Sequence, residues 1–214
     1  CLVLKWKFRQ GIEGGERQDI DDSGWEEKNS PCIWSMKNGV AYLRTIFTIP
    51  EKIEGVEIEN SDIYIEFVSP SGVSMFINGK EVYSYKFWAD MVAHPYPLVK
   101  KAVPGEKHLI VFKTPAGDGL GTFWGKISVS RIEDILFELN SILHQLKFAS
   151  DISDKERKLK PYVEEALNII NQQDIINRNW DKVLQDIKKA ETILEPFRKE
   201  AKKFTVHLIG HAHI

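Results

Sequence analysis

The segment "FTVHLIGHAHI" contains three histidines, His207, His211 and His213. Among the side chains of this sequence, theirs have the spacing that best fits a functional site. In an extended strand, side chains alternate between two faces, so His211 and His213 share one face with α-carbons about 6.5–7 Å apart. Two imidazoles at that separation can lean toward one metal ion, and zinc accepts nitrogen ligands. The His-x-His pair therefore indicates a candidate metal site, which needs at least one further ligand.

His207 lies four residues before His211, which is about 13 Å along a strand and too far to share the same ion. We expect it to be a packed, neutral imidazole. The face opposite the histidines is apolar or small throughout, which predicts a strand buried on both faces. Because helical periodicity precedes it, we expect the partner strands of residues 204–214 to lie beyond Ile214.

Other chemistry-bearing patterns in the sequence are weak. The glycine-rich "GDGLGTFWG" lacks the lysine and the strand-to-helix context of a phosphate-binding loop. Adjacent carboxylates are expected to be solvated loop charges: Asp21, Asp22, Glu26 and Glu27. One group of aromatic residues could form a sugar-stacking platform, although core packing is expected for most of its members: Trp25, Trp34, Tyr83, Tyr85, Phe87 and Trp88.

The composition is that of a globular protein, with 43% hydrophobic and 28% charged residues. A net charge of −2 provides no basic field for nucleic acid or an anionic membrane, and no apolar run approaches the roughly 20 residues of a membrane-spanning helix. The only cysteines, Cys1 and Cys32, argue against a disulfide scaffold and leave one bridge open. We expect a cytoplasmic chain that binds neither nucleic acid nor membrane.

The first 130 residues carry nearly all the β-strand patterning. Alternating segments such as "AYLRTIFTIP" and "DIYIEFVSP" end at prolines, and "VSMFINGKEVYSY" holds two apolar runs around Asn78-Gly79, a favoured hairpin turn. Further strands are expected in "CLVLKWKF", "PGEKHLIVFKTPAG" and "FWGKISVS". Short strands separated by turns, without intervening helices, predict a β-sandwich over residues 1–130.

At Ser130 the periodicity becomes helical, with Glu133 placed for a capping box. Residues 131–203 predict three helices, and Pro196 is expected to kink or end the third. Their apolar stripes are Ile132, Ile135, Leu136, Leu139, Ile142, Leu143 and Leu146; Tyr162, Ala166, Leu167 and Ile170; and Trp180, Val183, Leu184, Ile187, Ala190 and Leu194.

Taken with these elements, "FTVHLIGHAHI" resembles the first strand of the catalytic domain of glycoside hydrolase family 38 α-mannosidases. His211-Ala212-His213-Ile214 matches the family's His-[Ser/Ala]-His-[Ile/Asn], which an aspartate follows. Upstream, "DDSGWEEKNSPCIWSMKNGVAYLRTIFTIP", "VSMFINGKEV" and "PGEKHLIVFK" resemble the galactose-binding-like jelly roll that precedes that domain in the bacterial and archaeal branch.

The resemblance implies an α+β chain: a β-sandwich over residues 1–130, a helical linker over 131–203, and the severed first strand of a (β/α) barrel over 204–214. The parent would be a zinc-dependent retaining α-mannosidase that removes terminal α-linked mannose with a carboxyl pair about 5–5.5 Å apart. His213 would be a zinc ligand and His211 a weaker candidate beside it. The chain would hold no catalytic residue and no stably bound metal.

By the same resemblance, mannosides are the expected partners of the parent, and the fragment is expected to be inactive, with a structural, oligomer-forming or accessory role. Two alternatives stay open. The sandwich could be a non-catalytic carbohydrate-binding module, or the chain could be a fragment of an unrelated His-x-His metallohydrolase.

Overall fold

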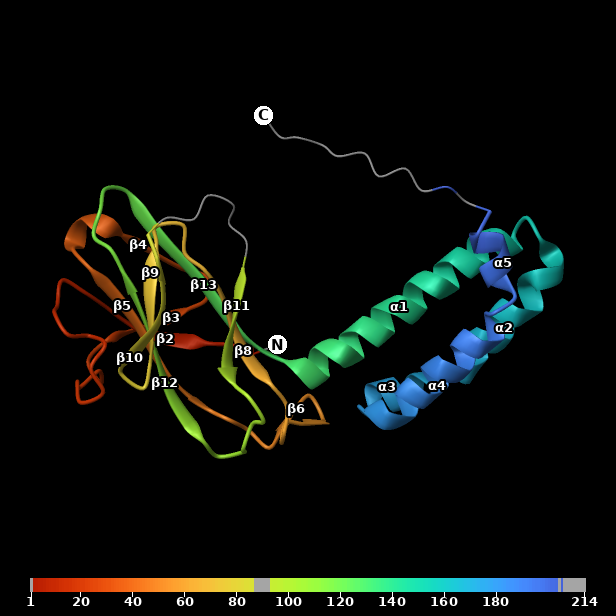
Figure 1. The fold of residues 1–214 in the computed structure, drawn as a ribbon, viewed down its shortest axis with the longest axis horizontal. Coiled ribbons are helices and arrows are strands. Elements are labelled where there is room, and N and C mark those ends of the chain that lie inside the picture. Colours follow the sequence, from red (N-terminus) through yellow and green to blue (C-terminus); the bar gives the residue numbers. More distant parts are fainter. Residues whose placement is uncertain (1, 87–92, 204, 206–214) are drawn as a thin grey trace. The chain divides into compact units, whose positions relative to one another are not determined.

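The computed structural model describes residues 2–86, 93–203 and 205. The chain divides into two compact units, Cys1–Ile53 with Glu57–Glu133, and Glu54–Val56 with Asp134–Ile214. Strands make up most of the first unit and helices most of the second (Figure 1). The barrel strand expected over residues 204–214 lies outside the described residues apart from Thr205, and the described ranges contain no barrel.

Two antiparallel sheets form the sandwich that the alternation predicted (Figure 1). One sheet has the order β1-β13-β8-β11, with β4 also paired to β13, and the other has the order β10-β9-β12-β5-β2-β3. The strands of the two sheets are β1 Leu2–Val3, β2 Lys5–Gln10, β3 Glu26–Asn29, β4 Cys32–Ser35, β5 Ala41–Thr48, β8 Ile63–Val68, β9 Val73–Ile77, β10 Lys80–Tyr85, β11 His94–Val99, β12 Lys107–Thr114 and β13 Leu120–Val129. Short β6 Lys52–Ile53 pairs with β7 Val56–Glu57, and a 3₁₀ turn, η1, spans Met36–Asn38.

The core between the sheets is built around four aromatic rings. Trp6 meets Phe112 and Phe123 edge-on, with ring centroids 5.5 and 5.2 Å apart. Phe112 lies 4.6 Å from Phe123 and 4.8 Å from Phe67. Trp6 and Phe112 belong to the six-stranded sheet, and Phe67 and Phe123 to the other. Aromatic pairs at these separations contribute beyond the area that they bury.

The predicted hairpin turn is confirmed at Asn78-Gly79, between β9 and β10. Both residues have positive φ, 50° and 80°, which asparagine and glycine accept at low cost. The Asn78 side chain adds a tertiary contact, because its Oδ1 accepts a 2.9 Å hydrogen bond from the Leu109 amide. The turn is thereby tied to strand β12.

A second, smaller core lies on the outer face of the six-stranded sheet. Tyr42 and Val111 are 1% and 0% exposed there, and Trp25 packs against them. The loop between β2 and β3 covers this face, with Ile12 and Ile20 among its contacts. Strand β5 is therefore buried on both faces over its first half, which accounts for its unbroken run of buried residues.

Arg44 fixes this covering loop to the sheet. Its guanidinium is 3% exposed; Nε donates to Asp22 Oδ2 at 2.9 Å, and Nη1 donates to the carbonyls of Gly15 and Arg17 at 2.7 and 2.8 Å. The expectation that Asp22 is a solvated loop charge is therefore wrong, because a buried cation requires a paired anion. The Trp25 ring lies 5.5 Å from the guanidinium carbon and adds a cation–π contact.

The outermost strands of both sheets are short or interrupted. Strand β3 reads Glu-Glu-Lys-Asn, β11 contains Pro95 and Pro97, and the register of β10 shifts between Glu81 and Tyr83. On the side of β13 away from β8, the two short strands β1 and β4 pair at separate places. Between them, the Gly125 amide donates to the Ser30 hydroxyl at 2.9 Å.

The second unit packs its helices around a core of their own. Its elements are α1 Ser130–Ser153, η2 Arg157–Leu159, α2 Lys160–Ile169, α3 Gln172–Ile176, α4 Trp180–Ile193 and α5 Phe197–Ala201. The helix start at Ser130 and the helix end before Pro196 are confirmed. No helix in the described ranges is both long and apolar enough to cross a membrane.

Two of the predicted apolar stripes are partly wrong. On α2, Tyr162 and Leu167 are 40% and 54% exposed, whereas Val163 and Ala166 are buried. On α1, Leu143 is 60% exposed, although it follows the predicted spacing. Residues one apart on a helix lie 100° apart, so the neighbour of a buried residue can point away from the core even where the spacing admits it. The stripe of α4 is confirmed by buried Val183, Ile187, Ala190 and Leu194.

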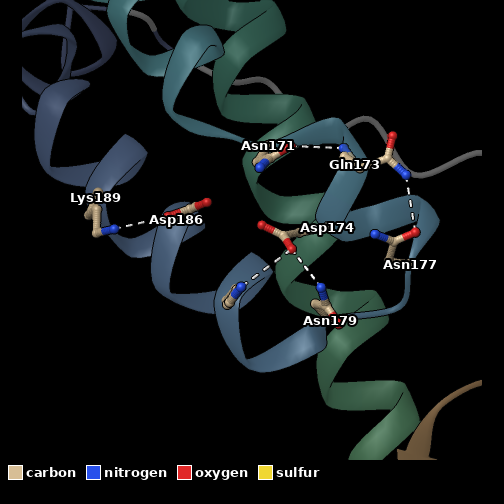
Figure 2. Close-up of polar contacts among 8 residues, drawn as sticks. Asn171, Gln173, Asp174, Asn177, Asn179, Asp186 and Lys189 are labelled. Atoms are coloured by element: carbon tan, nitrogen blue, oxygen red, sulfur yellow. Dashed lines mark hydrogen bonds and ion pairs between the residues drawn. The ribbon is translucent and has the colours of Figure 1, made fainter.

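Polar side chains fix the short helix α3 and the start of α4 (Figure 2). Asn171 Oδ1 accepts from the Gln173 amide at 2.9 Å as the N-cap of α3. Asp174 Oδ1 then accepts from Asn179 Nδ2 at 2.6 Å, which holds the turn into α4. Lys182 lies 3.9 Å from the same carboxylate.

Cys32 makes the stability of the sandwich depend on pH. Burial raises the pKa of its thiol to about 11, and Sγ donates to the Asn29 carbonyl at 3.3 Å. Between pH 9 and 11 the folded chain therefore keeps a proton that the unfolded chain loses. We expect the free energy of unfolding to fall across this window by an amount on the order of 2 kcal/mol, and the contribution to be fully present below pH 9. Denaturant unfolding of wild type and Cys32→Ala, measured from pH 8 to 11, tests this; parallel curves would contradict it.

Arg44→Met should destabilise the sandwich. The substitution removes the hydrogen bonds to two loop carbonyls and to Asp22 at a buried position, so we expect a loss of about 2–4 kcal/mol in urea unfolding. The matched control is Lys7→Met, which removes the ion pair with Glu27 on the same sheet, where the two side chains are 34% and 64% exposed. Its loss should be several times smaller. Equal losses for the two variants would show that Arg44 does not fix the loop.

Candidate ligand-binding cleft

The metal site predicted from the sequence cannot be placed. His211 and His213, and His207 before them, lie outside the described residues, so the assignment of His213 as a zinc ligand and His211 as its neighbour stays a prediction. Within the ranges that the structure describes, no group of three or more histidine, cysteine or carboxylate side chains could hold a metal ion.

The aromatic residues considered for sugar stacking are mostly core residues. Trp25 and Trp34 are 9% and 5% exposed, which confirms core packing for both. Tyr83 and Tyr85 are half-buried and pack on Phe67, at centroid distances of 5.8 and 6.5 Å. Phe87 and Trp88 lie outside the described residues. The described members do not form a platform, but Tyr85 lines a cavity.

A cleft of about 440 Å³ opens at one end of the six-stranded sheet. Strands β9, β10 and β12 contribute most of its wall, and the residue before β5 completes it. The described lining residues are Val40, Val73, Ser74, Tyr85, Lys86, Lys113, Thr114, Pro115 and Ala116.

The strand register aligns these residues side by side across the sheet. Tyr85 is paired with Val73, and Lys113 with Ser74, so the start of β9 lies between the end of β10 and the end of β12. Thr114 is paired with Ala41 at the start of β5. Four strands therefore begin or end together, and the cleft lies where their pairing stops.

The hydroxyl of Tyr85 holds one wall of the cleft. It donates to the Ser69 carbonyl at 2.9 Å and accepts from the Ser69 amide at 3.1 Å, and Ser69 is fully buried. Burial raises the pKa of Tyr85, so the phenol remains a neutral donor. Gly72, with φ of 84°, lies so close that a Cβ would stand 2.2 Å from the Lys86 carbonyl oxygen. Only glycine lets the chain approach Lys86 in this way.

The cleft contains two lysines. Lys86 is exposed and Lys113 half-buried, with the Lys113 ammonium 5.8 Å from the centre of the Tyr42 ring. Neither lysine forms an ion pair with a carboxylate in the described part of the chain. The lining thus offers an aromatic ring, hydroxyl groups and cationic donors, and its described residues include no acid–base pair of carboxyls.

Sequence reasoning identified only Tyr85 among these residues, and for another reason. Lys113 and Ser74 occupy strand positions that ordinarily face outward, and neither belongs to a recognisable motif. The available signal was the end of β12, where "KTPAG" places a lysine and a threonine directly before a proline turn. That segment predicts where one strand ends. It does not predict which other strands end beside it, because that depends on tertiary pairing.

Comparison with known proteins finds similar solved structures but does not assign the chain to a family. No family model matches the chain, and no curated protein matches it. Solved structures that resemble the sandwich include a glycosyl hydrolase family 2 member from Bacteroides cellulosilyticus (22% identity, TM-score 0.44, 58% of this chain and 20% of that one) and a beta-glycosidase from Bacteroides vulgatus (21%, 0.45, 59% and 20%). A beta-glucuronidase from Faecalibacterium prausnitzii matches at 14% identity and a TM-score of 0.41, over 53% of this chain and 20% of its own. The chain therefore matches about a fifth of the length of these proteins.

These comparisons correct the identification made from the sequence. The matched structures include a glycosyl hydrolase family 2 member and a beta-glycosidase, so the assignment to family 38, the zinc-dependent retaining α-mannosidase activity and the α-mannosidase parent are wrong. The physical reason is that strand alternation and turns report the packing of a sandwich, which unrelated glycosidases share. The His-x-His segment was too short to distinguish one family from another.

Tyr85→Phe should lower stability while keeping the ring in the cleft. The change leaves the buried amide of Ser69 without its partner, whereas the Ser69 carbonyl keeps its 3.2 Å hydrogen bond from the Gly72 amide, so we expect a loss of about 1–3 kcal/mol in urea unfolding. Tyr83→Phe is the matched control, because no hydrogen bond holds its hydroxyl in the described structure and its ring also packs on Phe67. Equal stability of the two variants would contradict the role assigned to the Tyr85 hydroxyl.

Proposed function

We propose that the sandwich is a non-catalytic carbohydrate-binding domain and that a saccharide binds in the cleft between β9, β10 and β12. In this proposal residues 1–130 form the binding domain and residues 131–203 a helical linker. The observation that carries it is the lining: Tyr85, whose hydroxyl is fixed by Ser69, lines a cavity of about 440 Å³ together with residues that bear hydroxyl and ammonium groups.

The chemistry of the lining fits a saccharide. A sugar presents C–H groups that pack on an aromatic face and hydroxyl groups that need hydrogen-bond partners in fixed positions. Tyr85, Ser74 and Lys113 all line the cavity, which therefore includes an aromatic residue and polar groups. A mostly apolar cavity with a few placed polar groups is the usual form of a small-molecule site.

Hydrolysis of a glycosidic bond requires two suitably placed carboxyl groups. The described cleft residues supply none, which supports binding without catalysis. The likeness to family 2 glycosidases agrees with an accessory domain of a glycoside hydrolase, and the proposal does not depend on it. A cytoplasmic location stays a prediction.

Calorimetric and NMR titration of the 214-residue chain with methyl glycosides of glucose, galactose and mannose tests the proposal. We expect at least one sugar to bind, with amide shifts at the ends of β10 and β12 and the start of β9. Ala116→Trp, which places a bulky ring at an exposed lining position, should weaken binding about tenfold or more.

Val103→Trp is the control, because Val103 is 52% exposed in the loop before β12, at the other end of the sheet. Its binding should equal that of wild type. Absence of binding by every sugar and uronic acid tested, or shifts that map away from the cleft, would overturn the proposed function.

A further inference from the structure

We infer that the cleft selects acidic saccharides, with the carboxylate of a hexuronic acid bound between Lys86 and Lys113. The inference rests on the proposed function and names the class of sugar that the cleft takes. Its evidence is the arrangement of charge around the start of β9.

The two lysines stand on opposite sides of this strand. Lys86 follows the end of β10, whose last residue pairs with Val73, and Lys113 pairs with Ser74 from β12. Neighbouring strands lie about 4.8 Å apart, so the flanking strands are separated by about 10 Å. Lysine side chains are long enough for both ammonium groups to reach one carboxylate placed above β9.

Both cations lack a carboxylate partner within the described chain, in contrast to the other lysines of the sandwich sheets that lie near acidic residues. Lys7 pairs with Glu27 at 3.1 Å, and Lys126 with Glu66 at 3.1 Å. At the cleft, the strand positions that could supply a matching acid hold Ser74 and Thr114 instead. The described lining residues therefore include two lysines and no carboxylate, although the chain as a whole has a net charge of −2.

The position of Lys113 limits where its ammonium can go. Its stem is half-buried, and its ammonium lies over the ring of Tyr42, a residue that is 1% exposed. The pKa of Tyr42 is raised to about 12, by its burial and by the charge of Glu16, so the phenol beneath the ammonium is neutral. A carboxylate in the cleft would gain a charge-assisted hydrogen bond from a cation that is already partly positioned.

Matched sugar pairs isolate the carboxylate. Glucuronate and glucose, and galacturonate and galactose, differ only in carrying a carboxylate or a hydroxymethyl group at C5. In titrations of the 214-residue chain at low salt, we expect the uronic acid of a pair to bind about tenfold more tightly or better, and the difference to shrink in about 0.5 M NaCl.

Lys113→Met and Lys86→Met should each reduce uronic acid binding by about fivefold or more, and should weaken binding of the neutral sugar by a clearly smaller factor. Lys80→Met is the control, because Lys80 is exposed at the opposite end of β10 and should leave both sugars unaffected. Circular dichroism of each variant establishes that it is folded.

The outcomes separate the two proposals. Equal binding of the uronic acid and its neutral partner would overturn the inference and leave the proposed function standing, whereas no binding by any sugar would overturn both. Acetate binding as tightly as the uronic acid would reduce the site to a simple anion site and would also overturn the inference. Uronic acid binding that survives both lysine substitutions would do the same.

Discussion

The packing of Trp6, Phe67, Phe112 and Phe123 between the two sheets is the interaction on which the rest of the sandwich depends. Two of these rings come from each sheet, and their edge-on and tilted contacts set how the sheets face each other. Sheets packed face to face lie about 10 Å apart, a distance that large rings fill without cavities. The strand ends that form the cleft stay aligned with one another because this core fixes the positions of their strands.

The six-stranded sheet is unusual in having packed groups on both faces at β5. Leu43 faces the central core and Tyr42 the smaller outer core, and both are buried. The loop of about fifteen residues between β2 and β3 has no regular secondary structure, and loops of that length in compact domains tend to be functional or disordered. Here the loop is ordered by Arg44, whose buried charge is matched by Asp22 and by loop carbonyls. The same face brings Tyr42 beneath Lys113, so the loop also supports the cleft.

Much of the fold could be predicted from the sequence because it depends on local patterns. Alternation placed β5 and β8, and Asn78-Gly79 placed a hairpin, since backbone preferences act over a few residues. On α2, Ala166 was predicted correctly, but Tyr162 was chosen where Val163 is buried, because both fit the spacing equally well and only the packed partner distinguishes them.

The cleft could not be predicted in the same way. Val73, Lys86 and Lys113 are distant in sequence, and only sheet pairing brings them to one level. The family assignment failed for a related reason. It used a sequence pattern that reflects packing to predict an enzymatic activity, although few residues of the sequence could take part in that chemistry.

The short and interrupted outer strands have a consequence for the behaviour of many copies of this chain in one solution. An open strand edge is a template for pairing with another molecule, and continuous edges favour aggregation. Here β3 is short and charged, Pro95 and Pro97 remove amide donors from β11, and a register shift bends β10. On β13, the Gly125 amide, which lies between the places where two separate short strands pair, donates its hydrogen bond to the Ser30 hydroxyl. Each edge is thus closed by a different local device, so the described strands of the sandwich present no long continuous edge to which a second molecule could add a strand.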